Sequence, residues 1–396
     1  MKLLIHDYSG HPFQVQLSRS LARRGYNVLH VYSGSFQTPH GTLIKRDCDP
    51  DNFEIYGIHL SKPFNKYSFI KRRNQEIEYG NLLIEKVLHF NPDIVISANT
   101  PLDAQSILLK KCVKEKIKFV FWLQDLYGIA IKKILRKKIP VLGKLIGHHY
   151  ERLERTLLRR SDSIIVITED FLPLMNSYSV QKEKLHVIHN WAPIEEIPSL
   201  PRINQWSKEH GLDDKFCFLY SGTLGLKHNP DIILKLALHF KKNDKIRVIV
   251  LSKGIGIDWL RGKKEQMIID NLILKDYQYY ELLPSVLASA DVLLTILESD
   301  AGIFSVPSKV LTYLCIGRPL LLAMPSENLA ARIVKSNNAG IIVNPNDDAA
   351  FVQAAESLMN DKNLCEELSK NAIFFAEKNF DIETITNKFE KIILSL

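Results

Sequence analysis

An acidic loop followed by the start of a helix is the strongest chemical signal in the sequence. Residues 298–319 read ESDAGIFSVPSKVLTYLCIGRP and lie between two apolar runs, ADVLLTIL and LLLAM. A loop that joins a buried strand to a helix presents free backbone N–H groups beside its polar side chains. The pattern therefore predicts a site for an anionic ligand.

The beginning of each half of the chain carries a second signal of the same kind. The first half begins KLLIHDYSGHPFQVQLSRSLARRG, which predicts a strand, a turn and then a helix that ends before Gly25. The second half begins FCFLYSGTLGLKHNPDIILKLALHF, in which Asn229 is a good N-cap and Pro230 suits the first helical position. Both loops are expected at the carboxyl edge of a sheet.

The size and composition of the chain set limits on the fold that must position these loops. At 396 residues, 46% of them hydrophobic, the chain can bury two cores. Its five cysteines include no C-x-x-C pair, which argues against a disulfide framework or a thiolate zinc site and fits a reducing cytosol. We expect neither a secretory signal nor a membrane span.

Short apolar runs alternate with longer segments of helical period along the whole chain. The strand candidates are KLLIH, NVLHVY, DIVIS, KFVFWL, SIIVIT and KLHVI in the first half and FCFLY, IRVIVLS, DVLLTI, PLLLAM and GIIVN in the second. They lack strict polar alternation, which indicates parallel sheets covered by helices on both faces. We therefore predict an α/β protein with two Rossmann-like, doubly wound parallel-sheet domains that face a cleft.

A proline-rich segment separates the two halves. Residues 190–206 read NWAPIEEIPSLPRINQW, and the three prolines rule out a regular element. We predict a first domain at 1–192, a second at 193–378 and a C-terminal helix at 379–396 that packs back on the first domain. Ligands of open α/β sheets collect outside the carboxyl ends of the strands, so the predicted site is the cleft between the domains.

The second half resembles the nucleotide-sugar domain of GT-B glycosyltransferases of family 4. The resemblance is carried by GTLGLK, by the strand that ends in an acidic loop, and by PSKVLTYLCIGRP and NAGIIVNPND. The opening HDYSGHPFQVQLSRSLARRGYNVLHVY is similar to the acceptor domain of bacterial surface-polysaccharide enzymes of that family, including the fucosamine-transferase-like branch. The resemblance implies retaining, metal-independent transfer from a nucleotide diphosphate sugar, without any required cofactor.

Negative charge grows on the diphosphate as the glycosidic bond breaks, so cations and N–H dipoles near it lower the barrier. Lys227 is the candidate cation, although a solvated lysine before a helix is the plain alternative. Ser221, Gly222 and Thr223 are expected along the phosphates. The family often has an arginine where this chain has Thr223, so Lys309 is a candidate to complete the clamp.

The acidic loop is expected to hold the donor sugar. Glu298 or Asp300 would accept hydrogen bonds from sugar hydroxyls, and Gly302 lets the backbone approach closely. Ile303 and Phe304 would offer backbone N–H groups, and Ser308 with Lys309 would begin the next helix. The alternative is a helix-capping turn. Where the family usually has a glutamate for the ribose, this chain has Thr312, which leaves open the choice among UDP, GDP and dTDP.

The acceptor side is expected in the first domain. The strand KFVFWL leads into Gln124 and Asp125, and Asp125 could take or orient the proton of the acceptor hydroxyl. Equally, Asp125 could cap the next helix. Residues Gly10, His11 and Gln14 of the first loop could reach the acceptor or the donor phosphate, but a histidine in a turn is more often solvated.

Other patterns carry less chemistry. The Asp-x-Asp in DCDPD, residues 47–51, contains a proline and reads as an exposed turn, so we expect no metal site. His148 and His149 are adjacent, which points their rings apart on a helix. No dinucleotide fingerprint or phosphate loop supports NAD or ATP.

The positive charge is concentrated in one segment. Residues 131–160 contain ten Lys or Arg and two Glu, so the segment has a net charge of +8, equal to that of the whole chain. Interleaved Ile and Leu suit an amphipathic stretch on an anionic membrane surface, with a solvated helical face as the alternative, and Pro140 interrupts any single helix. Nucleic acid is not expected because the block lacks aromatic stacking residues interleaved with its basic residues, and no reading module is recognisable.

The combined hypothesis is a cytoplasmic glycosyltransferase that lies peripherally on the inner face of the membrane. It would transfer a sugar from a nucleotide diphosphate sugar to a lipid-linked or growing polysaccharide acceptor. The alternatives are a GT-B epimerase or phosphorylase and a non-catalytic, two-lobed binding protein.

Overall fold

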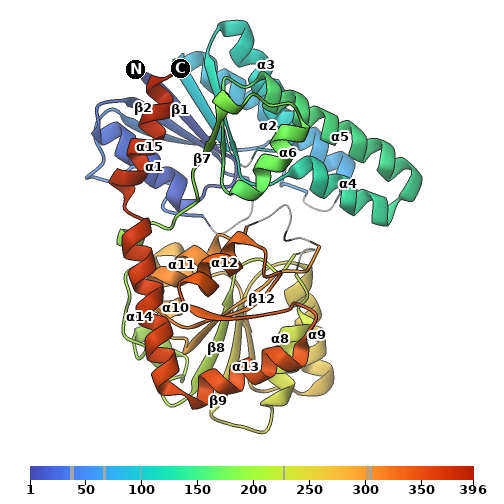
Figure 1. The fold of residues 1–396 in the computed structure, drawn as a ribbon, viewed down its shortest axis with the longest axis vertical. Coiled ribbons are helices and arrows are strands. Elements are labelled where there is room, and N and C mark those ends of the chain that lie inside the picture. Colours follow the sequence, from blue (N-terminus) through green and yellow to red (C-terminus); the bar gives the residue numbers. More distant parts are fainter. Residues whose placement is uncertain (36–39, 66–67, 99, 226–227, 301, 303–305) are drawn as a thin grey trace. The chain divides into compact units, whose positions relative to one another are not determined.

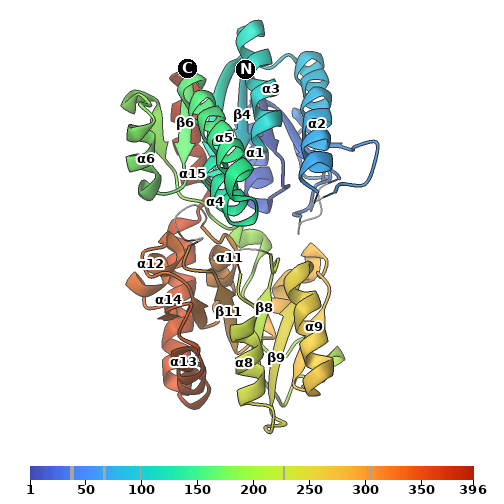
Figure 2. The same ribbon diagram turned by 90° about the vertical axis from the view of Figure 1, so that its right-hand side faces the viewer.

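The computed structural model describes residues 1–396 except 36–39, 66–67, 99, 226–227, 301 and 303–305. The chain forms two compact units, one made of Met1–Asn190 with Ile382–Leu396 and the other of Trp191–Asp381. Each unit contains one all-parallel β-sheet with helices packed on both faces (Figures 1 and 2). The predicted class of two doubly wound α/β domains is confirmed.

The first unit is built on a seven-stranded sheet in the order β3-β2-β1-β4-β5-β6-β7. Its central strands are buried along nearly their whole length, as expected where helices cover both faces. Its elements are β1 (Lys2–Asp7), α1 (Pro12–Arg23), β2 (Asn27–Ser33), β3 (Phe53–Ile58), α2 (Phe69–Phe90), β4 (Ile94–Ala98), α3 (Leu102–Glu115), β5 (Lys118–Leu123), α4 (Tyr127–Lys138), α5 (Pro140–Arg160), β6 (Ser163–Val166), α6 (Leu172–Ser177), β7 (Leu185–Val187) and α15 (Ile382–Leu394).

The second unit is built on a six-stranded sheet in the order β10-β9-β8-β11-β12-β13. Its core joins the inward faces of β8, β9 and β11 to α8 and α13. Its elements are α7 (Gln205–Glu209), β8 (Phe216–Ser221), α8 (Asp231–His239), β9 (Ile246–Leu251), α9 (Ile255–Met267), β10 (Leu272–Lys275), α10 (Leu283–Ala288), β11 (Val292–Ile296), α11 (Lys309–Ile316), β12 (Leu320–Ala323), α12 (Leu329–Ser336), β13 (Gly340–Val343), α13 (Asp348–Asn360) and α14 (Lys362–Asn379).

Each predicted strand corresponds to a strand of the structure, but two strands were missed. These are β3 and β10, and each lies at the edge of its sheet. The residues of β3 alternate between buried and exposed, and β10 has only four residues, mostly half-buried. The edge strands β7 and β13 were predicted from their apolar runs KLHVI and GIIVN. Strand β3 was therefore missed because of its mixed polarity, whereas the run LILK of β10 is as long as β13 and could have been recognised.

The helix α15 follows the second unit in the sequence but packs on α1 of the first. Phe389 is fully buried, and its ring meets Trp122 of β5 edge to face at 4.8 Å between centroids. At the rim, Arg24 donates to Glu383 and to Glu390, each at 2.7 Å. The C-terminal helix therefore completes the core of the first unit.

The helices α4 and α5 form an antiparallel hairpin that packs on α3 of the first unit (Figure 1). The break falls at Ile139, just before Pro140. Glycines allow the helices to approach closely: a Cβ on Gly147 would lie 2.5 Å from the Cα of Lys132, and one on Gly143 would collide with the Leu135 carbonyl. Among the described residues, no helix is long and apolar enough to cross a bilayer.

A buried carboxyl group holds the base of this hairpin. Glu154 of α5 has no exposed surface and accepts a hydrogen bond from the backbone N–H of Gly128, at the start of α4, at 3.0 Å. Burial raises the pKa of Glu154 to about 8, outweighing the backbone N–H groups of Gly128 and Tyr127, which lower it. Glu154 is therefore mostly protonated at neutral pH.

Candidate functional site

The order of the second sheet determines where a ligand can bind. Strands β8 and β11 are neighbours, but the chain leaves β8 towards β9 on one side and leaves β11 towards β12 on the other. Such a reversal opens a crevice beyond the carboxyl ends of the two strands. The two loops that the sequence singled out, after β8 and after β11, both begin there.

The loop after β8 is held firmly by tyrosine hydroxyls. Tyr313 of α11 accepts a hydrogen bond from the Ser221 N–H at 2.9 Å and donates one to the Ser221 carbonyl at 3.0 Å. Burial raises the pKa of Tyr313, although the bond from Ser221 lowers it, so the hydroxyl keeps the proton that it donates. Thr223 bonds to the hydroxyl of Tyr277, and Tyr220 donates to the Thr223 carbonyl at 3.0 Å.

Gly222 and Lys309, 87 residues apart, are brought into contact. Gly222 has a φ of +132°, and a Cβ added to it would lie 2.6 Å from the Lys309 Nζ. That Nζ is buried and lies 3.7 Å from the ring centroid of Tyr220, a cation–π arrangement. Gly222 therefore exposes bare backbone beside an ammonium group, a combination that suits a phosphate.

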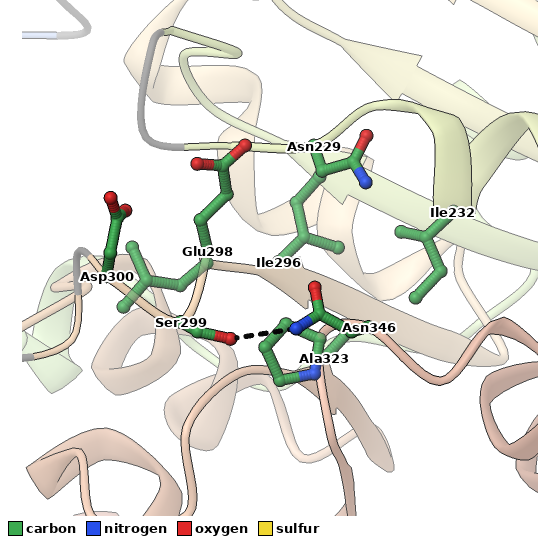
Figure 3. A pocket seen from close by; sticks show the side chains of 10 residues that line it. Asn229, Ile232, Ile296, Glu298, Ser299, Asp300, Ala323 and Asn346 are labelled. Carbon is green, nitrogen blue, oxygen red and sulfur yellow. Dashed lines mark hydrogen bonds between the residues drawn. The ribbon is translucent and has the colours of Figure 1, made fainter. Parts of the chain in front are cut away.

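The acidic loop after β11 lines a pocket of about 290 Å³. Figure 3 shows Glu298 and Asp300 extending from the loop to the same side, with Asn229 across from them. Asn346, from the loop after β13, donates to the Ser299 hydroxyl at 3.3 Å. Carboxylate and amide groups around a small hollow can exchange hydrogen bonds with several hydroxyl groups, which is what a sugar presents.

The remaining predicted residues of this loop lie around the beginning of α11. Ser308 is the N-cap residue of α11, Lys309 begins the helix, and half-buried Thr312 lies one turn further on. The helix ends at Gly317, with a φ of +70°, as predicted. The Gly302 carbonyl accepts a hydrogen bond from Asn328 at 3.0 Å. Lys227, Ile303 and Phe304 lie outside the described residues.

Asn229 has a double role that the sequence showed only in part. The predicted N-cap is displaced by one residue: α8 begins at Asp231 and its N-cap residue is Pro230, while the Asn229 side chain, one residue earlier, accepts from the Asp231 N–H at 3.0 Å. It also lines the pocket of the acidic loop. Residues that follow β8 therefore approach residues that follow β11 in two places: at this pocket, and where Gly222 contacts Lys309.

In the first unit, the loop after β1 contains a carboxylate–imidazole pair. Asp7 is fully buried and accepts from the backbone N–H groups of Ser9 and His11. Its Oδ1 lies 3.5 Å from Nδ1 of His11. Burial by itself raises the pKa of Asp7, but the interactions with His11 lower it below its usual value. Asp7 thus orients His11, and nothing in the sequence marked Asp7 apart from its place at the end of a strand.

The other acceptor-side candidates lie at the carboxyl edge of the same sheet but are not equally accessible. Gln124 is buried and exchanges amide hydrogen bonds with Asn190, at 3.1 and 2.6 Å. Gln14 is fully buried in α1, whereas Asp125 is half-buried after β5. Gly10 has a φ of +72° and turns the chain towards α1. Of these side chains, those of His11 and Asp125 are the most exposed to solvent.

One sequence interpretation is right only in part: Asp47, Cys48 and Asp51 lie in an exposed turn, as expected. The DCDPD segment was read as an exposed turn, but Asp49 is buried and accepts from Nε of Arg19 at 2.9 and 3.1 Å. The segment is a turn whose second aspartate anchors it to α1. Among the described residues, no group of three or more His, Cys, Asp or Glu side chains could hold a metal ion.

Both halves of the chain match models of glycosyltransferase domains. Residues 202–374 match Glycosyl transferases group 1, and residues 13–196 match Glycosyltransferase Family 4. A probable glycosyltransferase, WbjE of Pseudomonas aeruginosa, is 26% identical over 278 residues. These residues cover 67% of this chain and 66% of the relative, slightly less than two thirds of its length.

Solved structures of the same fold include a complex with a nucleotide sugar and a glycosyltransferase. Anabaena HepE in complex with UDP-glucose superposes with a TM-score of 0.73 at 15% identity over the whole of both chains. WaaG, a glycosyltransferase involved in lipopolysaccharide biosynthesis, gives a TM-score of 0.66 at 16% identity over 99% of both chains. At these identities the likeness shows the fold. The chain is therefore built from two glycosyltransferase domains, a family 4 domain over residues 13–196 and a group 1 domain over residues 202–374, on the GT-B fold.

Proposed function

We propose that the protein is a retaining glycosyltransferase that uses a nucleotide diphosphate sugar, with the donor held by the second domain. The observation that carries the proposal is the contact between Gly222 and Lys309 at the reversal of the second sheet, where β11 also leads into the loop of Glu298 and Asp300. The solved HepE complex holds UDP-glucose, and WaaG acts in lipopolysaccharide synthesis, which supports this donor class and a surface-glycan acceptor.

In this proposal the ammonium groups and backbone N–H dipoles stabilise the diphosphate as it leaves. The bond from the anomeric carbon to the diphosphate breaks while the acceptor oxygen bonds to the same face of that carbon. Lys309 supplies one cation beside Gly222, and Lys227 is proposed as a second. Glu298 and Asp300 accept hydrogen bonds from the sugar hydroxyls, so they hold the donor without forming a covalent bond to it.

The acceptor is proposed to bind at the carboxyl edge of the first sheet. Asp125 takes or orients the proton of the acceptor hydroxyl, and His11, oriented by Asp7, contacts the acceptor or the donor phosphate. The division of labour between residues 1–192 and 193–378 follows from this arrangement. We further propose that the basic segment 131–160 associates with an anionic membrane surface, where a lipid-linked acceptor is available.

The first test is donor binding. In a thermal-shift panel of UDP, GDP and dTDP sugars, one nucleotide class is expected to raise the melting temperature, because it binds the folded state selectively. Lys309→Ala is expected to reduce that shift, and Lys227→Ala to reduce turnover at saturating donor by at least about 100-fold. Lys335→Ala, on the exposed end of α12, is the matched control.

The second test is turnover. Incubation with the selected donor and a lipid-linked acceptor is expected to release the nucleoside diphosphate only when both are present. Release of nucleotide or free sugar from donor alone would instead indicate epimerase or phosphorylase chemistry. Donor binding without any turnover would leave only a binding protein.

A further inference from the structure

A second hollow lies on the outer surface of the first unit, between α3 and α5. Its volume is about 280 Å³, similar to that of the pocket in the second unit. Leu109, Leu153 and Leu157 contribute apolar surface to it, so the hollow has an apolar lining beneath its polar rim. It belongs to the first unit alone and is therefore distinct from the proposed donor site.

The rim of this groove is positively charged. Lys110 of α3 and Arg152 and Arg160 of α5 line it, together with His149, and no carboxylate is among the lining residues. Within the described part of the chain, none of the three permanent cations forms an ion pair. The neighbouring Lys111, by contrast, pairs with Glu115 at 2.8 Å. The groove therefore concentrates uncompensated positive charge above an apolar surface, which favours an anion that carries an apolar chain.

The groove continues along one face of α5 into an apolar patch. Leu145, His149, Arg152, Thr156 and Arg160 follow one another at spacings of four, three, four and four residues, which places them on a single helix face. The opposite face carries Gly143, Gly147 and Glu154, which pack against α4.

At the beginning of α5, the same outer face is apolar and uncovered. Val141 is 78% exposed, Leu145 67% and Leu142 59%. A helix rises about 1.5 Å per residue, so Leu145 lies about 10 Å along the axis from Arg152. That separation is comparable to the depth of the headgroup layer that an interfacial helix penetrates. The face thus presents apolar side chains at one end and guanidinium groups at the other.

We propose that the groove between α3 and α5 binds the phosphate headgroup of an anionic phospholipid while Val141, Leu142 and Leu145 enter the acyl layer. This assignment rests on the proposed function only for the presence of a membrane, and it goes further by placing the headgroup at particular cations. Lys110, Arg152 and Arg160 bind the phosphate, and the leucines of the groove form the apolar wall beneath these cations. The α4–α5 hairpin is thereby oriented with its tip towards the bilayer.

The test measures binding to vesicles of phosphatidylcholine with and without about 30% phosphatidylglycerol, by flotation at roughly 0.05 M salt. The groove variant is Arg152→Gln with Arg160→Gln. The matched control is Arg155→Gln with Arg159→Gln, which removes the same charge from the same turns of α5 but from residues that do not line the groove. A third variant, Leu142→Ser with Leu145→Ser, tests the apolar patch.

The groove variant is expected to lose at least tenfold in affinity for the anionic vesicles and the control less than about threefold. The apolar variant is expected to lose the binding that remains at roughly 0.5 M salt, where surface charges are screened. Equal losses in the groove and control variants would overturn the site in favour of diffuse charge. The lipid assignment would be overturned if the wild type bound no vesicles but was stabilised by inorganic phosphate, and if the groove variant lost that stabilisation.

These outcomes are separable from those of the proposed function. Flotation requires no turnover, and a cooperative thermal unfolding transition without any ligand reports that each variant is folded. A protein that floats normally but fails in every donor assay would retain the headgroup site and lose the transferase proposal. The converse result would retain the transferase proposal alone.

Discussion

The buried carboxyl group of Glu154 gives the first domain a pH-dependent stability that one substitution removes. In the folded chain its pKa is about 8, against 4.5 for an unperturbed glutamate. Between these values the folded state keeps a proton that the unfolded state has released, so stability falls as the pH rises. Below pH 4.5 both states are protonated, and above pH 8 both are ionised, so the loss is confined to this window.

The magnitude follows from the shift. The unfolding free energy can fall by at most about 1.4 kcal/mol per pH unit through one titrating group. Glu154 therefore lowers the unfolding free energy by about 2.5 kcal/mol between pH 5.5 and 7.5. Glu154→Gln cannot titrate, has nearly the same shape, and keeps an oxygen that can accept from the Gly128 N–H. Relative to wild type, the variant is therefore expected to gain about 2.5 kcal/mol of unfolding free energy over that range.

Urea unfolding of wild type and variant at several pH values between 5.5 and 8.5 measures this difference. His6 and His30 are buried, and burial lowers their pKa values to about 3 and about 4, but they titrate in both proteins and cancel. Glu115→Gln is the control. The ion pair with Lys111 lowers the pKa of Glu115, so this residue adds almost no pH dependence to the unfolding free energy above pH 5.5. Parallel stability curves for wild type and Glu154→Gln would refute the reasoning.

Three further substitutions test packing and the site. Phe389→Ala is expected to destabilise the first unit by about 3–5 kcal/mol, because the ring is fully buried against an indole, and urea unfolding measures it. Gly147→Ala should lower the melting temperature through the close approach of α4 and α5, whereas Gly262→Ala, with open space around its Cα, should not. Gly222→Ala should weaken nucleotide binding at least tenfold in calorimetry, because its Cβ would meet the ammonium beside it, whereas Gly225→Ala has room. Each contact would be contradicted by an unchanged value: the unfolding free energy for Phe389→Ala, the melting temperature for Gly147→Ala, or the nucleotide affinity for Gly222→Ala.

The inner strands could be predicted because burial on both faces leaves a continuous apolar run in the sequence. Strand β3 could not, because polar and apolar residues are mixed along it, whereas β10 was missed although its run is as long as that of β13. Helix ends followed local rules: Gly317 ends α11 and Pro140 begins α5, as their backbone preferences dictate.

The candidate site was predictable only where a residue's chemistry is visible from its neighbours in sequence. Glu298 and Asp300 stand out as carboxylates directly after an apolar strand. Tyr313 and Tyr277 were missed because their roles depend on hydrogen bonds to residues 92 and 54 positions away. The same limit explains Asp49, whose partner Arg19 lies on another element. The charge of segment 131–160 was visible in the sequence, but the sharing of one face by apolar and basic residues required the structure.

The packing of α15 on α1 makes the first domain a discontinuous folding unit. A ribosome must complete the entire second domain before it synthesises the helix that covers Trp122 and Arg24. Until then the nascent first domain keeps an apolar surface open, which is a natural binding site for chaperones and a risk for aggregation. Expression of residues 1–192 alone would preserve that incomplete state permanently, whereas supplying the helix as a separate peptide would restore the missing wall.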